Sequence, residues 1–529
     1  MTKNNYDVVV VGAGFAGLYM LHNLRSRGFS VKVFEAGGDI GGTWYWNRYP
    51  GARCDVESLE YSYQFSEELQ QEWVWSERYA TQAEILKYAH HVADRFELRQ
   101  DIQFDTHIAK MTFDETSSSW ITTTAGGEII VSSFCVMATG CLSSTNIPAI
   151  KGRETFTGGT YHTGNWPHQE PDFTGKKVGI IGTGSSGVQS IPLIAEQADH
   201  LYVFQRTPSY AIPAYNGPYD PEYERERKAN YKSYREEAKN SRSGFLLAIN
   251  EDMAMDVGNK ERQAVYEQRW KRGGLTFLGA FNDLLTNKEA NDTAADFVRG
   301  KIREVVEDPK IAEKLSPKTV VGCKRMCVDT DYYQTYNRDN VTLLDVSEHP
   351  IEEITANGIR RNGEEFELDE LVFATGFDAM TGALAKIDIQ GRNGTSLKKK
   401  WAEGAKTYLG VAISGFPNLF IVTGPGSPSV LANMMPAIEH HVEWISDCIT
   451  HCRKTKSNRI EASGDAEEAW VAQTNELASQ TLFPTCNSWY LGANIPGKPR
   501  IFMPYLGFQR YLAACEEIVK NGYKGFSLS

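Results

Sequence analysis

The chain has 529 residues, a net charge of −12, and a composition of 23% charged and 41% hydrophobic residues. This composition is typical of a folded protein and excludes disorder along the whole chain. The acidic balance, with no basic block, argues against nucleic acid as the main partner. No stretch approaches the about 18 apolar residues of a membrane span, so none is expected.

The nine cysteines are scattered, and none belongs to a Cys-X-X-Cys motif. Cys323 and Cys327 lie four residues apart, as do Cys448 and Cys452, with His451 beside the second pair. We expect ordinary buried thiols rather than a metal site at these pairs. Because the first residues also lack the apolar core of a signal peptide, the sequence predicts a cytoplasmic location.

The chain begins with a strand–helix–strand pattern. Residues 6–11 form a continuous apolar run, typical of a strand that is buried on both faces. A helix is expected to about residue 27, and Gly28 stops it. Residues 31–34 form the second strand, which ends at Glu35.

A glycine fingerprint joins the first strand to the helix. It consists of Gly12, Gly14 and Gly17. The first glycine permits a tight turn, the second lets a pyrophosphate approach the backbone, and the third packs the helix on the strand. Glu35 lies 23 residues after Gly12, where a carboxylate accepts hydrogen bonds from ribose hydroxyls. The pattern predicts a dinucleotide with a free ribose, such as FAD.

The same pattern returns later in the chain. The second fingerprint consists of Gly182, Gly184 and Gly187. Strands are expected over residues 177–181 and 200–205, and Arg206 follows where the first unit has Glu35. A cation at this position suits a 2′-phosphate and offers no acceptor to a free ribose. We therefore expect NADPH here; the alternative is that Arg206 is a solvated surface charge.

A helical insertion is expected after the second fingerprint. Residues 222–308 contain no proline and are rich in Glu, Lys, Arg and Ala. One helical face gathers Phe297, Val298, Ile302, Val305 and Val306. Strand patterns return over residues 341–344, 371–373 and 418–422, and a last helix is expected over residues 511–521.

This order of patterns predicts an α/β protein with two Rossmann-like dinucleotide-binding domains and a helical insertion, the plan of two-dinucleotide flavoproteins. The expected segments are residues 1–148 and 381–529 for the FAD-binding domain, 149–218 and 317–380 for the NADP-binding domain, and 219–316 for the insertion.

A longer motif lies between the two fingerprints. Residues 156–167, FTGGTYHTGNWP, match FxGxxxHxxxWP at every fixed position. In these residues the sequence resembles the type I Baeyer–Villiger monooxygenases, for which this pattern is the defining signature. Related N-hydroxylating and flavin-containing monooxygenases carry an ending without Trp166 and Pro167. We assign His162 a role in coupling the domains only.

The resemblance extends over nearly the whole chain. It implies oxidation of a small-molecule ketone to an ester or lactone with NADPH and O₂, through a C4a-peroxyflavin and a Criegee intermediate. FAD and NADPH are the implied cofactors, and a monomer is expected. One alternative is a flavin-containing monooxygenase that oxygenates nitrogen or sulfur. Another is a disulfide reductase, which would need a redox-active cysteine pair near the flavin.

The fingerprints and the resemblance together imply the residues that bind the cofactors. These are Gly12, Gly14, Phe15, Gly17, Glu35, Thr43, Trp44, Trp46, Arg53, Asp55, Tyr61, Thr183, Gly184, Ser185, Ser186, Gly187, Gln189, Arg206, Thr207, Lys324, Arg325, Met434 and Trp489. In the resembling family, the segment around Trp489 is a mobile loop whose tryptophan touches NADP.

Arg325 and Asp55 are the catalytic residues that the resemblance implies. A guanidinium stays charged and offers a planar fork of donors, so it can stabilise oxygen anions in a site that excludes water. Asp55 would hold the arginine, and the pair would avoid a lone buried charge. Taken in isolation, Lys324 and Arg325 would indicate a solvated basic pair, and Asp55 a turn residue.

Overall fold

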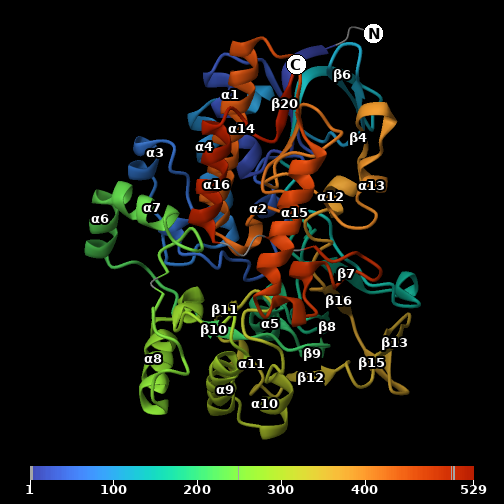
Figure 1. Ribbon diagram of the computed structural model, residues 1–529. Coiled ribbons are helices and arrows are strands. Elements are labelled where there is room, and N and C mark those ends of the chain that lie inside the picture. The colour runs from blue at the N-terminus through green and yellow to red at the C-terminus, as the bar shows by residue number, and fades with distance from the viewer. Residues whose placement is uncertain (1–3, 248, 502, 504–506) are drawn as a thin grey trace.

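Two mainly parallel β-sheets organise the chain in the computed structural model, which describes residues 4–247, 249–501, 503 and 507–529 (Figure 1). Helices pack around both sheets. The α/β fold class that the sequence predicts is therefore confirmed.

The larger sheet has the strand order β17-β4-β5-β6-β1-β2-β3, and β18 pairs with β6. Its strands are β1 (Asn4–Val11), β2 (Val31–Phe34), β3 (Ile102–Gln103), β4 (Ile108–Asp114), β5 (Ser119–Thr124), β6 (Ile129–Met137), β17 (Asp388–Gln390) and β18 (Leu419–Ile421). At its centre Val10 pairs in parallel with Val33 and Val136, and all three side chains are fully buried. This burial on both faces explains the continuous apolar run of the first strand.

The second sheet is entirely parallel, with the order β12-β9-β8-β16-β7. Its strands are β7 (Gly159–His162), β8 (Lys177–Ile181), β9 (His200–Gln205), β12 (Val341–Asp345) and β16 (Glu370–Phe373). Each sheet thus draws strands from two separated stretches of the chain, as the expected order of domains requires. The exact domain boundaries remain a prediction.

Four long helices cover one face of the larger sheet (Figure 1). They are α1 (Phe15–Ser26), α4 (Gln82–Arg95), α14 (Met434–Thr455) and α16 (Phe508–Lys520). Met20 of α1 accepts a hydrogen bond from Ser446 of α14, and His441 of α14 bonds to Tyr511 of α16. The last helix, expected over residues 511–521, is therefore confirmed with an earlier start.

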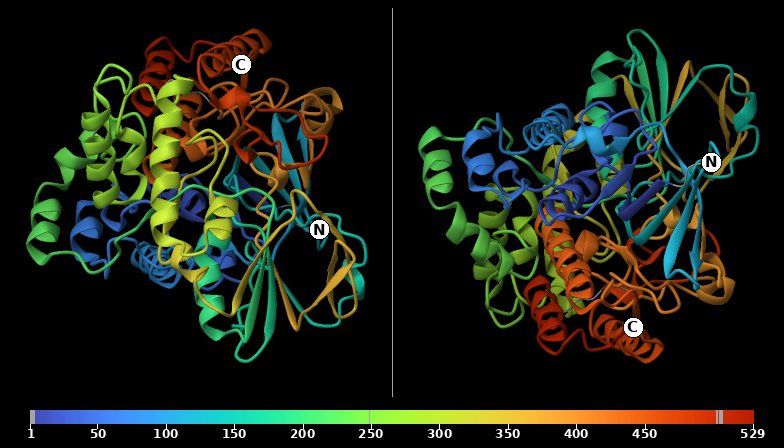
Figure 2. Two further views of the ribbon diagram at one scale, coloured as in Figure 1. Left: turned by 90° about the horizontal axis from the view of Figure 1, so that it is seen from below. Right: turned by 90° about the horizontal axis from the view of Figure 1, so that it is seen from above.

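The insertion is helical, as predicted. It contains α6 (Pro221–Ala229), α7 (Tyr231–Lys239), α8 (Asn259–Arg272), α9 (Lys288–Val305) and α10 (Pro309–Leu315). These helices lie on the side of the molecule away from the N-terminal end (Figure 2). In α9 the predicted apolar face is buried at Phe297, Val298 and Ile302, and partly at Val305.

Further helices and strands complete the chain. The helices are α2 (Thr43–Trp46), α3 (Glu67–Glu72), α5 (Ser185–Gln197), α11 (Tyr332–Thr335), α12 (Gly382–Ala385), α13 (Leu397–Lys400) and α15 (Gly464–Ser479), and the strands are β10 (Ala211–Pro213), β11 (Cys327–Asp329), β13 (Ile351–Ile354), β14 (Gly358–Arg361), β15 (Glu364–Glu367), β19 (Ile460–Ala462) and β20 (Phe526–Leu528). Among the described residues, no helix has the length and apolar character that crossing a membrane demands.

The cysteines differ from expectation at one pair. Cys323 and Cys486 form a disulfide, with Cα atoms 5.9 Å apart, so Cys323 is not the free thiol that the sequence predicts. The two cysteines lie 163 residues apart, and only the tertiary fold brings them together. The other seven cysteines are buried free thiols. No group of side chains suited to a metal ion occurs in the part of the chain that the structure describes.

Candidate active site

The first glycine turn forms a cradle that only glycine permits. Gly12 has φ = +106°, and a Cβ there would lie 2.5 Å from the carbonyl oxygen of Ala138. A Cβ on Gly17 would lie 1.8 Å from the carbonyl oxygen of Gly12. Gly14 caps α1, so the free N–H groups of the helix begin at this turn. This geometry fits a pyrophosphate at the helix N-terminus.

Glu35 lies beside this turn at the end of β2. Its Oε2 accepts a hydrogen bond from Ala13 N at 2.6 Å, and its Oε1 accepts one from Gly37 N at 2.8 Å. Burial raises the pKa of Glu35, and the backbone N–H groups oppose that rise. Each carboxylate oxygen has a second lone pair. The side chain therefore retains acceptors for ribose hydroxyls.

The second turn repeats the first. Gly182 has φ = +110°, and its Cβ would lie 2.4 Å from the carbonyl oxygen of Ala374. A Cβ on Gly187 would lie 2.3 Å from the carbonyl oxygen of Gly182. A Cβ on Gly184 would meet nothing within 4 Å, so the middle of the turn faces open space. Ser185 and Ser186 follow as the first residues of α5.

Two cations lie next to this turn. Arg206 is exposed at the end of β9, and Lys324 is half-buried. Burial, and then repulsion from Arg206, lower the pKa of Lys324. Thr183 donates its hydroxyl to the carbonyl oxygen of Thr207 at 3.2 Å, which ties the turn to the residue after Arg206. Two cations held side by side fit an anion such as a 2′-phosphate.

Arg325 and Asp55 form an ion pair between distant parts of the chain. Nε of Arg325 lies 3.2 Å from Oδ2 of Asp55, and the side chains are 24% and 13% exposed. Nη1 of Arg325 also donates to the carbonyl oxygen of Val430 at 2.9 Å. Five N–H groups belong to a guanidinium, so these two bonds leave further donors for another ligand.

The environment of the pair keeps the arginine charged. Burial, the largest single influence, would by itself lower the pKa of Arg325. The nearby Asp55, Tyr490 and Cys54 together outweigh burial, and the net direction is upward. Burial raises the pKa of Asp55, and Arg325 opposes the rise. A buried pair in this geometry carries both charges, because each compensates for the other.

Three of the flavin-loop residues predicted by resemblance, Thr43, Trp44 and Trp46, lie in helix α2. Thr43 begins α2, and the indole N–H of Trp44 donates to the Tyr61 hydroxyl at 3.2 Å. The carbonyl oxygen of Trp46 accepts a hydrogen bond from the backbone N–H of Trp166 at 3.1 Å. The signature motif is therefore joined directly to this loop.

His162 lies where the chain connects the two sheets. Its Nδ1 accepts from Gly164 N at 2.9 Å, and its Nε2 lies 3.4 Å from the hydroxyl oxygen of Thr375. Thr375 in turn donates to the carbonyl oxygen of Asn146 at 2.6 Å. Burial lowers the pKa of His162, which favours the neutral ring. This position supports a role in coupling the domains.

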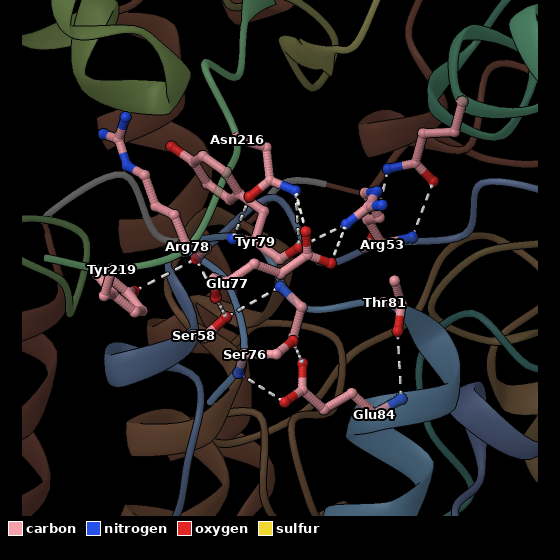
Figure 3. A network of polar contacts seen from close by, with 12 residues as sticks. Arg53, Ser58, Ser76, Glu77, Arg78, Tyr79, Thr81, Glu84, Asn216 and Tyr219 are labelled. Atoms are coloured by element: carbon pink, nitrogen blue, oxygen red, sulfur yellow. Dashed lines mark hydrogen bonds and ion pairs between the residues drawn. The ribbon is translucent and has the colours of Figure 1, made fainter. Parts of the chain in front are cut away.

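Three predicted cofactor residues have other partners. Nη1 of Arg53 binds Oε1 of Glu77 at 2.5 Å and the carbonyl oxygen of Tyr79 at 2.9 Å (Figure 3). The Gln189 side chain binds the backbone of Arg53 and accepts a hydrogen bond from the Tyr49 hydroxyl at 2.8 Å. Phe15 is buried, and its ring packs against that of Tyr63 with centroids 5.4 Å apart. Their roles toward a cofactor stay predictions.

The partners of Arg53 belong to a polar network that joins the first domain to residues 214–219 (Figure 3). Asn216 accepts from Tyr79 N and donates to Glu77, both at 2.8 Å. Arg78 N donates to the carbonyl oxygen of Gly217 at 2.9 Å. This network fixes the start of the helical insertion against the domain that carries Asp55.

Sequence reasoning did not place Tyr490 among the site residues, although it did predict its neighbours in the site, Trp489 and Met434. Tyr490 lies beside Arg325; burial raises the pKa of Tyr490 to about 12, and the guanidinium limits the rise. Trp489, half-buried, begins the same short turn. Met434, also half-buried, begins α14, in the segment that follows Val430. The only signal for Tyr490 was its position next to Trp489.

Known proteins resemble this chain over its full length. A family model described as pyridine nucleotide-disulphide oxidoreductase matches residues 9–235. A Baeyer–Villiger monooxygenase from Pseudooceanicola batsensis is 44% identical over 98% of this chain and 95% of the relative. The chain belongs to the Baeyer–Villiger monooxygenase family. The family that the signature motif predicts is thereby confirmed.

Other relatives and solved structures match nearly the whole chain as well. A phenazine N-monooxygenase from Lysobacter antibioticus is 43% identical over 99% of this chain and 97% of its own. The solved structure of an oxidised steroid monooxygenase bound to NADP is 51% identical, with a TM-score of 0.95 over 99% of both chains. An OTEMO complex with FAD and NADP is 39% identical, with a TM-score of 0.96 over 100% of both chains.

This Baeyer–Villiger monooxygenase contains a disulfide between Cys323 and Cys486. Neither cysteine lies within residues 9–235, where the disulphide oxidoreductase model matches. The chain also has no Cys-X-X-Cys motif. The bridge is therefore no evidence for a disulfide reductase.

Proposed function

We propose that this protein oxidises ketones to esters or lactones with NADPH and O₂, and that the Asp55–Arg325 pair is its catalytic centre. The reaction class and the cofactors FAD and NADPH are those of the Baeyer–Villiger monooxygenase family. The observation that carries the role of the pair is a half-buried guanidinium held by the Asp55 carboxylate and by the carbonyl oxygen of Val430. A guanidinium stays charged in proteins. When bound, FAD accepts hydride from NADPH and activates O₂ for insertion beside the carbonyl.

The first glycine turn holds FAD in this proposal. Gly12, Gly14 and Gly17 keep the backbone clear for the pyrophosphate, and the α1 N-terminus supplies N–H donors. Glu35 accepts from the ribose hydroxyls. Trp44 and Tyr61, joined by their hydrogen bond, belong to the loop predicted to contact the flavin. The closeness of Gly42 to Gly14 supports a common site, because a Cβ on Gly14 would lie 3.4 Å from Gly42 Cα.

The second glycine turn holds NADPH. Gly184 leaves space for the pyrophosphate, and Ser185 and Ser186 begin the helix that faces it. Arg206 and Lys324 bind the 2′-phosphate, which compensates for the repulsion between them. Lys324 is adjacent to Arg325 in the chain. The segment that binds the 2′-phosphate of NADPH therefore also carries the catalytic guanidinium.

Arg325 has one chemical task in this proposal. It offers N–H donors to the oxygen anions that develop as the carbonyl is attacked, where low polarity makes such bonds strong. Asp55 and Val430 fix the plane of the guanidinium, so few degrees of freedom remain to be lost during the reaction. The balanced reaction consumes one ketone, one O₂, one NADPH and one proton, and yields one ester or lactone, one NADP⁺ and one water.

The partners are a small-molecule substrate and O₂. A monomer and a cytoplasmic location are further parts of the proposal. Seven of the nine cysteines are buried free thiols, which is usual where thiols stay reduced. The bridge between Cys323 and Cys486, by contrast, is an oxidised pair.

Product analysis with a panel of ketones tests the proposed function. We expect NADPH consumption to rise with a cyclic, linear, aryl or steroid ketone, and an ester or lactone to form. Phenazine is included because one relative is named for N-oxygenation of that compound. Formation of an N-oxide with no ester from any ketone would replace this proposal by the alternative of nitrogen oxygenation.

A further inference from the structure

Glu60 lies at a junction of segments around the Asp55–Arg325 pair. It ends the 3-10 turn η1 (Ser58–Glu60), five residues after Asp55 and directly before Tyr61. Its side chain is only 12% exposed. Its carboxylate and its backbone carbonyl bind different parts of the chain.

The carboxylate of Glu60 reaches into the insertion. Oε2 accepts a hydrogen bond from the backbone N–H of Leu246 at 2.8 Å. Oε1 lies 3.4 Å from Nη2 of Arg227 on α6. One buried carboxylate therefore holds both a helix of the insertion and the segment of residues 242–246.

The segment of residues 242–246 packs against the starts of two helices. The carbonyl oxygen of Ser243 accepts from Asn433 N at 2.8 Å, next to the start of α14. The carbonyl oxygen of Arg242 accepts from Phe508 N at 2.8 Å, at the start of α16. A Cβ on Gly244 would lie 3.1 Å from the Phe508 ring, so the contact is close.

The backbone carbonyl of Glu60 binds the same region from the other side. It accepts from Nδ2 of Asn433 at 2.9 Å and from Nη1 of Arg235 at 3.2 Å. Asn433 lies three residues after Val430, whose carbonyl oxygen binds Arg325. Glu60 is thus connected to the catalytic pair through Asp55 on one side and through the 430–433 segment on the other.

We propose that Glu60 is a positioning residue, which holds the 242–246 segment beside the Asp55–Arg325 pair as one wall of the ketone site. This inference rests on the proposed function, because the pair marks the ketone site only if it is catalytic. A side chain without an acceptor at position 60 leaves the Leu246 N–H without this partner and releases the Leu246 end of the segment. Because the segment is assigned to the ketone site alone, we expect hydride transfer between the cofactors to stay unchanged.

The first test compares two substitutions at Glu60 with a matched control. Glu60→Gln retains an acceptor for Leu246, whereas Glu60→Leu removes it. Glu57→Gln is the control, because Glu57 is 16% exposed and binds Arg78 at 2.7 Å instead. With Glu60→Leu we expect KM for the ketone to rise about tenfold or more and the product ratio from an unsymmetrical ketone to change. The rate of flavin reduction by NADPH should remain at the wild-type value.

The outcomes for the other two variants decide the mechanism. Glu60→Gln and Glu57→Gln should both stay within about threefold of the wild-type KM, with the wild-type product ratio. If Glu60→Gln were as impaired as Glu60→Leu, the ion pair with Arg227 would be responsible and the positioning hydrogen bond would be refuted. An equal effect of Glu57→Gln would likewise overturn the proposal.

The second test does not depend on turnover. Hydrogen exchange at the Leu246 amide of the FAD-bound enzyme should be about tenfold or more faster in Glu60→Leu and near wild type in Glu60→Gln. Leu246→Pro removes the donor in place of the acceptor, and we expect the same changes in KM and product ratio. Leu246→Pro also tests the proposal if the Glu60→Leu variant does not fold. Unchanged exchange and kinetics in these variants would refute the role of Glu60, whereas absence of ester from the wild-type enzyme would refute the proposed function instead.

Discussion

Arg325 and Asp55 lie 270 residues apart in the chain, yet Nε of the arginine is 3.2 Å from Oδ2 of the aspartate. The aspartate comes from the domain of the first glycine turn, and the arginine follows the lysine that faces Arg206. The pair therefore spans the two dinucleotide-binding units.

Arg325→Ala should remove ester formation while FAD stays bound. Losing one group that stabilises developing anionic charge lowers rates by about 10²–10³-fold. The measurement is ester yield per NADPH consumed, with bound flavin determined by absorbance. Arg27→Ala is the control, because Arg27 pairs with Asp447 at the surface. Normal ester yield from Arg325→Ala would contradict its catalytic role.

Asp55→Asn tests the other half of the pair separately. The amide retains the size of the side chain but removes the charge that compensates for Arg325. We expect a loss of ester yield in the same direction as for Arg325→Ala, with a smaller effect, because the guanidinium is still present. A wild-type rate and yield would show that Asp55 does not hold the arginine.

Arg206→Ala and Lys324→Ala should weaken the binding of NADPH much more than that of NADH. Each variant loses a charged bond to the 2′-phosphate, which corresponds to about 10–100-fold in KM. Steady-state kinetics with both nucleotides measure the effect. Lys318→Ala, at a side chain that is 82% exposed, is the control. An equal loss for NADH would mean that the two cations do not bind the 2′-phosphate.

The bridge between Cys323 and Cys486 should be present in the purified enzyme. Intact mass should increase by about 2 Da on reduction, since each sulfur gains one hydrogen. Cys323→Ser and Cys486→Ser should each lower the free energy of unfolding by about 2–4 kcal/mol, and the double variant should lose no more than either. Cys452→Ser, at a buried free thiol, is the control. Two free thiols at these positions in the native enzyme would contradict the bridge.

Stability should fall as the pH rises through the range in which Glu439 titrates. Burial raises the pKa of Glu439 from 4.5 to about 7. Its Oε1 accepts a hydrogen bond from Gln64 N at 2.6 Å, whereas its Oε2 has no partner among the described residues. The folded state keeps the proton longer than the unfolded state, so the loss accumulates between about pH 4.5 and 7.

Glu439→Gln removes this titration. At pH 8 its Tm should exceed that of the wild type, because its free energy of unfolding is higher by up to about 3 kcal/mol. This gain in stability should vanish near pH 4. Scanning calorimetry at the two pH values measures it. Glu468→Gln, on an exposed residue of α15, is the control. A gain of the same size at both pH values would show that Glu439 does not titrate in this range.

Much of the fold could be predicted because local patterns carry it. The strands over residues 31–34, 177–181 and 200–205 were predicted with the bounds that β2, β8 and β9 have. Apolar runs followed by glycine turns leave few alternatives, because a buried parallel strand must be apolar on both faces. The fingerprints also located two cofactor turns, where a Cβ would collide with the backbone.

The candidate site was predictable only in part. Arg325 and Asp55 were paired by resemblance, and the structure brings them together. For Arg53 and Gln189, sequence position did not show that one side chain binds Glu77 and the other binds the backbone of Arg53. Such partners depend on side-chain direction, which a motif does not contain.

By itself the sequence determined the family, the α/β class and the two glycine turns, because each depends on residues that are close together in the chain. Only the tertiary structure decided that Cys486 meets Cys323, that Glu60 reaches Leu246, and that Val430 and Tyr490 complete the surroundings of Arg325. These contacts join segments separated by about a hundred residues or more, and their distances follow from how whole domains pack. No local pattern encodes that packing.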